Sequence, residues 1–257
     1  MSTMTPAAAV RIEYAKLRRR RLPLIGFVVI GAGLLFSSAS LFTATAQASF
    51  TDPEAAPWLQ LMLNLALTTA LTSPLLVAIL GSRVVEIEHQ GNGWVLARMA
   101  GRRRGELCRI KFLALTPLLV GLVGLQFILQ IFIARAAGLT QPLDVGLWAG
   151  YAGCVLLVGL ALLGLHICLS AWLENQLISL GLGVIGSFIG LFSLFMPPSL
   201  AHLLPWGYYA VSTPAAMTGP GQTLTATAPD LVGLAIFLAV FALGFWAATE
   251  ALNRKDS

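Results

Sequence analysis

The sequence predicts an all-α membrane protein with six transmembrane helices. Of the 257 residues, 57% are hydrophobic and only 11% are charged, whereas a soluble domain carries about 25% charged residues. The apolar residues gather in runs long enough to cross a bilayer core, which needs about 20 helical residues. None of these runs alternates like a barrel strand, and a lone span must satisfy its own backbone hydrogen bonds, so each run is predicted to be a helix.

Six apolar runs divide the chain, at residues 22–46, 58–81, 112–134, 147–171, 177–196 and 231–251. Within the first run, Ala44-Thr45-Ala46 resembles the small-residue cleavage site of a signal peptide. The run is much longer than the roughly 7–15 apolar residues of a signal peptide, and the charged segment before it is also long. We therefore expect this run to remain as a transmembrane helix.

The basic residues predict the orientation of the chain in the membrane. Of the 16 Lys and Arg residues, 15 lie in residues 11–21, 83–111 and 254–255, and only Arg135 lies elsewhere. Loops rich in Lys and Arg stay in the cytoplasm, so both termini and residues 83–111 are predicted to be cytoplasmic. The outer loops hold acidic residues that would attract a cationic ligand, or that remain there because basic residues are excluded, which we favour. These residues are Asp52, Glu54, Asp144 and Asp230.

Residues 83–111, RVVEIEHQGNGWVLARMAGRRRGELCRIK, place seven basic and three acidic residues between the second and third runs. The first eight of them are predicted to continue the second span as a helix, with Glu86 and Gln90 on one face. The next three, Gly-Asn-Gly, are predicted to form a turn, because Gly and Asn tolerate left-handed backbone.

A short amphipathic helix is predicted at residues 94–99, with Trp94 and Met99 exposed. A basic turn then leads into a helix that carries Arg104 and Lys111 on one face. Together these helices and turns of residues 83–111 form a bent segment, which we call the elbow. The elbow is either a docking surface for a soluble partner or a polybasic loop on anionic lipid, which would contribute about 1 kcal/mol per basic residue. We favour docking, because lipid contact explains neither the acidic residues nor the helix that bears Trp94.

Polar residues are rare inside the spans. Asn64, Gln126 and Gln130 either form interhelical hydrogen bonds or line a polar path in the outer half of the membrane. His166 in the fourth span is interpreted as a hydrogen-bonded structural residue rather than a proton relay. The fifth span carries small residues four apart, which permit close helix contact within the chain or at a dimer seam. These small residues are Ser179, Gly183 and Ser187, and Gly186 and Gly190.

The longest outer loop, residues 197–230, contains LLPWGYY. Trp and Tyr prefer the headgroup layer, where ring and polar tip are both satisfied. Short broken helices that enter the outer leaflet are therefore predicted, and Trp206, Tyr208 and Tyr209 become candidates for the substrate path together with Asn64 and the two glutamines.

Sequence motifs for catalysis are missing. The chain has no phosphate-binding loop of the type GxxxxGK[ST] and no HExxH zinc motif. Its three histidines are scattered, and its three cysteines, Cys108, Cys154 and Cys168, are predicted to be free thiols. We expect a protein that is not an enzyme, with no cofactor or metal of its own and no nucleic-acid partner.

The pattern R-x-x-E-x-E before the turn, the helix that bears Trp94, and Arg104 and Lys111 resemble the permease subunits of type-2 ABC exporters. The likeness implies one permease domain over residues 1–257, with a cytoplasmic coupling loop at residues 83–111 and an outer re-entrant segment at residues 197–230. RIEYAKLRRRRL, with Glu13, Lys16 and Arg18, resembles the amphipathic connecting helix of the family, placed at residues 1–21. The residues implied to couple to the ATPase are Glu86, Glu88, Trp94, Met99, Arg104 and Lys111.

The resemblance also implies partners. Two separate ATPase subunits would carry ATP and Mg²⁺, and a second permease, identical or a sister chain, would complete the transporter in the bacterial cytoplasmic membrane. Within the family, the chain looks most like lantibiotic-immunity permeases, which expel amphiphilic antimicrobial peptides to the outside. The alternatives are an exporter of drugs or lipids, an ATP-independent carrier, and a membrane anchor.

Overall fold

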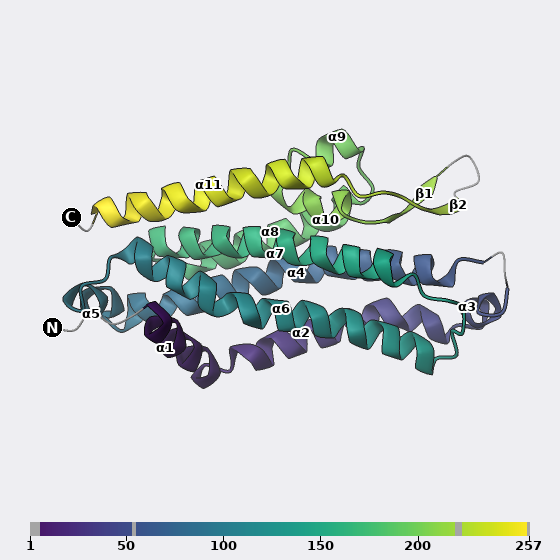
Figure 1. Ribbon diagram of the computed structural model, residues 1–257, viewed down its shortest axis with the longest axis horizontal. Coiled ribbons are helices and arrows are strands. Elements are labelled where there is room, and N and C mark those ends of the chain that lie inside the picture. The colour runs from purple at the N-terminus through teal and green to yellow at the C-terminus, as the bar shows by residue number, and fades with distance from the viewer. Residues whose placement is uncertain (1–5, 53–54, 219–222, 256–257) are drawn as a thin grey trace.

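The computed structural model describes residues 6–52, 55–218 and 223–255, and these residues form a bundle of long helices that run side by side (Figure 1). Six of the described helical segments are long and apolar enough to cross a membrane, and each overlaps one of the predicted runs; the segments that match runs 22–46 and 177–196 end earlier than predicted. The structure thus confirms a mostly helical protein with six candidate membrane spans. The six helical segments are Leu22–Phe42, Pro57–Gln90, Arg104–Ala136, Val145–Trp172, Gln176–Ser193 and Leu231–Lys255.

The first span is shorter than predicted. It consists of α2 (Leu22–Ser38) and the 3₁₀ turn η1 (Ala39–Phe42), and a separate helix, α3 (Ala44–Ser49), follows. Thr43 separates them because its backbone is extended and its side-chain oxygen accepts a hydrogen bond from the Ala46 N–H at 3.3 Å. Thr43 therefore caps a new helix where the apolar pattern predicted a continuous one.

Two helices extend well beyond the bilayer thickness. Helices α4 (Pro57–Gln90) and α6 (Arg104–Ala136) have 34 and 33 residues, about 50 Å each at 1.5 Å per residue. A hydrocarbon core is only about 30 Å thick. The prediction that the second span continues to Gln90 is confirmed, and the third helix starts earlier than its apolar run.

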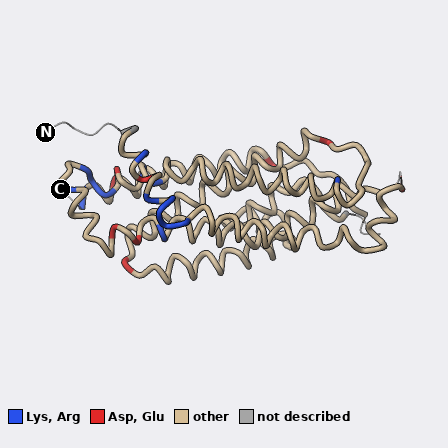
Figure 2. Tube along the Cα trace, turned by 90° about the horizontal axis from the view of Figure 1, so that it is seen from below, with Lys and Arg blue, Asp and Glu red and all other residues tan. Residues whose placement is uncertain are grey.

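Both chain ends lie at the same end of the bundle, where α1 (Pro6–Arg19) and the last turn of α11 (Leu231–Lys255) are found (Figure 1). Nearly all Lys and Arg residues gather there, and we call this the charged end (Figure 2). Arg135 lies in the last turn of α6, at the other end of the bundle, which we call the opposite end. The short helix α5 (Gly93–Met99) joins α4 to α6 at the charged end, as predicted. Asn92 before it has φ 51°, which confirms the expected left-handed turn.

At the opposite end, short helical pieces connect α8 (Gln176–Ser193) to α11. They are α9 (Pro198–Ala201), η2 (Pro205–Gly207) and α10 (Tyr208–Val211). A hairpin of β1 (Ala215–Thr218) and β2 (Thr223–Ala226) follows, with Met217 opposite Leu224. The broken helices were expected, whereas the hairpin was not.

The small residues of α8 face the interior of the same chain. A Cβ added at Gly183 would lie 2.3 Å from Ala78 Cβ on α4, and one added at Gly186 would lie 2.2 Å from Trp206 Nε1. A Cβ at Gly190 would lie 2.8 Å from the Ala70 carbonyl oxygen. Ser179 and Ser187 are also buried. These residues therefore pack within the chain, as the first alternative predicts, and a role at a dimer seam stays a prediction.

All three cysteines are buried free thiols, as predicted. Helix α7 (Val145–Trp172) carries two of them and packs between α4, α6 and α11. Glu54, counted among the outer acidic residues, lies outside the described residues, as do residues 1–5 of the predicted connecting helix and residues 219–222 of the predicted re-entrant segment.

Candidate functional site

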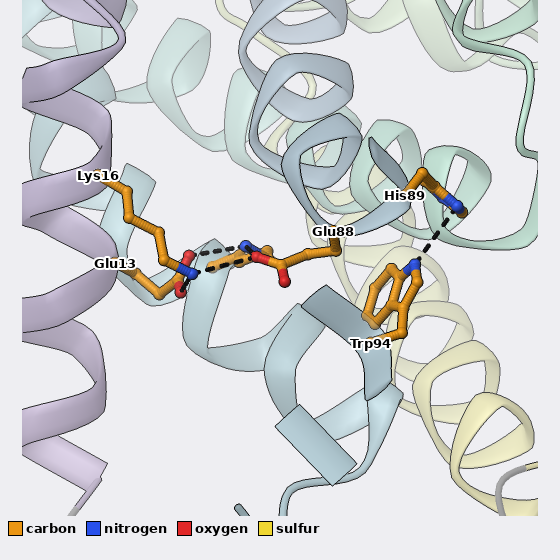
Figure 3. A network of polar contacts seen from close by, with 6 residues as sticks. Glu13, Lys16, Glu88, His89 and Trp94 are labelled. Carbon is orange, nitrogen blue, oxygen red and sulfur yellow. Dashed lines mark hydrogen bonds and ion pairs between the residues drawn. The ribbon is translucent and has the colours of Figure 1, made fainter. Parts of the chain in front are cut away.

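Four charged side chains from three helices form a closed ring at the charged end (Figure 3). Lys16 Nζ lies 2.6 Å from Glu13 Oε1 and 3.2 Å from Glu88 Oε1. Lys111 Nζ lies 2.7 Å from Glu13 Oε2 and 2.7 Å from Glu88 Oε1. Each ammonium group therefore contacts both carboxylates, and the ring joins α1, α4 and α6 with no net charge.

The ring is buried apart from Lys16. The side chain of Lys111 is fully buried and those of Glu13 and Glu88 are 4% exposed, while that of Lys16 is 34% exposed. Removing a charge from water costs several kcal/mol unless partners compensate it. Burial lowers the pKa of Lys16, but its contacts with Glu13 and Glu88 outweigh burial, so this pKa lies above the ordinary value.

The local sequence explains how these charges reach the interior. Glu13 lies between Ala9 and Leu17 at four-residue spacing, and all three are buried, so the carboxylate lies on the buried stripe of α1. Lys111 is flanked at the same spacing by Leu107 and Leu115, which are also buried. An ionisable residue within an apolar stripe needs a partner of opposite charge, which each helix receives from the others.

Helix α5 is held beside the ring by Trp94 and His89 (Figure 3). Trp94 Nε1–H donates to His89 Nδ1 at 3.3 Å, and His89 Nε2 lies 2.9 Å from the Ser170 carbonyl oxygen on α7. His89 therefore carries its hydrogen on Nε2 and links α5 to α7. The guanidinium of Arg104 lies over the Trp94 ring at 5.4 Å. A Cβ at Gly93 would lie 2.0 Å from Glu88 Oε2, so only glycine fits there.

The expected exposure of Trp94 is wrong, because the residue is only 8% exposed and anchors α5 to the bundle. Glu88 and Lys111, also expected to couple to the ATPase, lie in the buried ring. The apolar residues that α5 does present to the outside are Val95, Leu96 and Met99, which are 57%, 61% and 73% exposed. We call these three residues the α5 ridge.

Two more of the predicted coupling residues have local partners. Glu86 Oε1 accepts a hydrogen bond from Gln90 Nε2 at 2.6 Å, which confirms that these residues share a face. Arg104 is half-buried against Trp94. A cavity of about 380 Å³ opens between α1 and α5, and Glu13, Lys16, Glu88 and Leu96 are among the residues that line it. The ring therefore borders this cavity.

The predicted substrate-path glutamines hold helices together. Gln126 Nε2 donates to Thr69 Oγ1 at 3.2 Å. Gln130 Oε1 accepts from Ser37 Oγ at 2.7 Å, and its Nε2 donates to Ser38 Oγ at 3.0 Å. Both glutamines are buried, 5% and 0% exposed. The structure therefore shows the interhelical hydrogen bonds of the first alternative, and a role of the two glutamines in a substrate path stays a prediction.

Asn64 is half-buried and donates to Ser40 Oγ at 2.8 Å. The aromatic candidates of the outer loop pack inward: Trp206 and Tyr208 are 7% exposed and Tyr209 is 1% exposed. Tyr209 Oη lies 2.8 Å from Ser73 Oγ on α4. Trp206, Tyr208 and Tyr209 thus attach the loop to the bundle, and their place along a substrate path stays a prediction.

His202 connects α9 to the start of α11. Its Nδ1 lies 2.6 Å from the Pro198 carbonyl oxygen, and its Nε2 lies 2.9 Å from Asp230 Oδ2. Both ring nitrogens face acceptors, so the geometry fits the imidazolium form. The hydrogen bonds to Pro198 and then to Asp230 raise the pKa of His202. The Gly233 N–H and then His202 hold the pKa of Asp230 below its ordinary value.

His166, the other histidine of interest, is fully buried, and its Nδ1 lies 3.1 Å from Ser179 Oγ on α8. This contact supports a structural role. Among the described residues, no group of three or more His, Cys, Asp or Glu side chains is placed to hold a metal ion.

The closure of the ring was not predicted from the sequence. Glu13 and Lys16 were noted only as part of a resemblance, and their contacts with Glu88 and Lys111 span up to 98 residues of sequence. The usable signal was the position of Glu13 and Lys111 within apolar stripes, which predicts buried partners without identifying them.

A protein-family match extends over most of the chain. The family described as ABC-2 family transporter protein matches residues 9–190. The match includes the whole ring, α5 and all but the last turn of α8. No curated protein matches the chain.

Proposed function

We propose that this chain, which belongs to the ABC-2 family of transporter proteins, is the membrane permease subunit of an ATP-driven exporter. The family accounts for a multi-pass membrane protein that works with an ABC ATPase. One observation carries the proposal: within the region that matches the family, helix α5 is anchored on the bundle and presents an apolar ridge outward.

In this proposal the α5 ridge is the surface that the ATPase grips. Leu96 and Met99 would enter a groove of the ATPase, as exposed apolar residues of a short helix commonly do. Trp94 and His89 would pass the movement to α4 and α7, and Arg104 would pass it to α6. Because the ring links α4 and α6 to α1, a displacement of α5 would move three helices together.

The charged end is proposed to face the cytoplasm, because its Lys and Arg content fits the positive-inside rule. We propose the bacterial cytoplasmic membrane as the location, with residues 83–111 as the cytoplasmic coupling loop and residues 197–230 as an outer re-entrant segment. Two ATPase subunits would bind ATP and Mg²⁺, and a second permease chain would complete the transporter. ATP hydrolysis would then occur on the partners and not on this chain.

The substrate class that we propose is amphiphilic antimicrobial peptides, so the transporter would confer immunity to lantibiotics. The proposal rests on the resemblance of the chain to the permeases of that group. Exporters of drugs and of lipids share the same loop sizes, and the transport assay below therefore includes substrates of all three kinds.

Co-purification tests the ATPase partnership. The full chain is expressed with its host's proteins, extracted in mild detergent and captured, and ATPase subunits with a phosphate-binding loop are expected to co-purify. Met99→Asp places a charge on the α5 ridge and is expected to abolish this association while the chain still folds. Leu203→Asp is the matched control, since Leu203 is 76% exposed at the opposite end.

Transport is measured in vesicles that contain the permease with and without its ATPase. ATP-dependent efflux of a lantibiotic, but not of a drug or a lipid, supports the full proposal. Efflux without any ATPase would identify a secondary carrier. Association of an ATPase without efflux of any of the three would point to a membrane anchor instead.

A further inference from the structure

A cavity of about 580 Å³ opens at the opposite end of the bundle, between η1, α3, the start of α4 and the β hairpin. Its volume lies within the range of small-molecule sites, about 300–1,000 Å³. Leu41, Phe50 and Leu61 contribute an apolar wall, and each is at most 5% exposed. This wall suits a hydrocarbon group.

The cavity also holds polar groups with unused hydrogen-bonding capacity. Ser40 Oγ accepts from Asn64, and Gln60 Nε2 donates to Asn64 Oδ1 at 3.3 Å. Among the described residues, the Ser40 hydroxyl hydrogen, the Gln60 side-chain carbonyl oxygen and the Thr45 hydroxyl make no further hydrogen bond to the protein, and the exposed side chains of Thr45 and Gln60 are accessible to water or to a ligand. These groups offer both donors and acceptors, which is the pattern that a hydroxyl group of a ligand satisfies.

No residue that is described as lining the cavity is ionisable. A charged group that moved from water into the cavity would find no ion-pair partner among these described lining residues, and such a transfer is unfavourable without one. An uncharged polar head avoids this cost and can bond to Ser40, Thr45 and Gln60.

We propose that this cavity binds an amphiphile with an uncharged, hydroxyl-bearing head, such as a glycolipid. The tail would lie against Leu41, Phe50 and Leu61, and the head would bond to Gln60 and Thr45. The inference goes beyond the proposed function, because binding here requires neither the ATPase nor transport.

Photolabelling tests the site with the full chain in phosphatidylcholine nanodiscs without an ATPase. The probe is an octyl glucoside with a diazirine in its chain, and mass spectrometry locates the labelled peptides. Labelling is expected within residues 40–61. Unlabelled octyl glucoside should compete for it, whereas free glucose should not, because glucose lacks the tail. A trimethylammonium probe with the same chain should label this region about three- to ten-fold less.

Two variants address the cavity directly. Gln60→Leu removes a hydrogen-bond acceptor and Thr45→Trp fills the space, and each should weaken labelling about three- to ten-fold. Gln47→Leu and Ala44→Trp are the matched controls, because both residues are exposed on α3 and do not line the cavity. Labelling is compared only between proteins that have the same melting temperature and are monodisperse in detergent.

Equal labelling by the glucoside and the ammonium probe would overturn the proposal, as would unchanged labelling in both cavity variants or competition by glucose. Specific labelling in a protein that shows no ATP-dependent efflux would retain this site and remove the proposed function. ATP-dependent efflux from a protein that is not labelled at residues 40–61 would retain the proposed function and remove this site.

Discussion

At the scale of single residues, Lys111 shows how a charge is kept inside a membrane protein. Its ammonium group is fully buried, and the carboxylates of Glu13 and Glu88 both lie 2.7 Å away. The desolvation cost is several kcal/mol per ion, so no member of the ring is stable in the interior alone. The two positive and two negative side chains hold one another in place.

Lys111→Met should destabilise the protein by about 3–5 kcal/mol, because two buried carboxylates would then share only Lys16. The free energy of unfolding is measured by SDS titration in mixed micelles. The double variant Lys111→Met, Glu13→Gln restores the charge balance, and it should recover about 0.5–3 kcal/mol of the loss.

Arg109→Met is the matched control on the same helix. Arg109 pairs with Glu250 at 3.1 Å, but both side chains are about one-third exposed. Its replacement should cost about 1 kcal/mol or less. A loss at Lys111 no larger than the loss at Arg109 would refute the role assigned to the ring.

His202 gives the opposite end a dependence on pH. Its pKa is raised in the folded protein, so its bonds to Pro198 and Asp230 contribute fully below about pH 6.5, the ordinary histidine value. This contribution is lost as the pH rises through the higher folded-state pKa. The melting temperature of the wild type should therefore fall above pH 6.5 relative to that of His202→Gln, which does not titrate. Parallel profiles of the two proteins would contradict the assignment.

At the scale of the element, α8 depends on the absence of side chains on its buried face. Gly183→Leu should destabilise the protein by about 1–3 kcal/mol or more, because the new Cβ would lie 2.3 Å from Ala78 Cβ. Gly181→Leu is the control, since a Cβ at that position meets no atom within 4 Å. Unfolding in SDS measures both, and equal effects would show that the contact with α4 is not what limits residue size.

At the scale of the whole molecule, orientation is open to a direct test. The three native cysteines are buried and should react poorly with a maleimide that does not cross membranes. Met99→Cys lies at the charged end and Gln47→Cys at the opposite end, and both sites are exposed. In intact spheroplasts only Gln47→Cys should be labelled, and Met99→Cys should become reactive after lysis. The reverse pattern would invert the proposed topology.

The sequence was sufficient for the spans and for the elbow, because apolar length and a Gly-Asn-Gly turn are local signals. It was insufficient wherever partners are distant in the chain. Trp94 was expected outside because a short amphipathic helix does not reveal which face its neighbours cover. Gln126 and Gln130 were left with two alternatives, since their hydroxyl partners Ser37, Ser38 and Thr69 belong to other helices.

The ring also constrains the biosynthesis of the chain. Glu13 lies 98 residues before Lys111, so at about 5–20 residues per second the ribosome needs about 5–20 s to supply the missing ammonium group. During that interval Lys111 cannot compensate the cost of burying the Glu13 carboxylate, so this side chain stays in water. The first helix to emerge must therefore wait at the surface and settle into place only after the third span has been inserted.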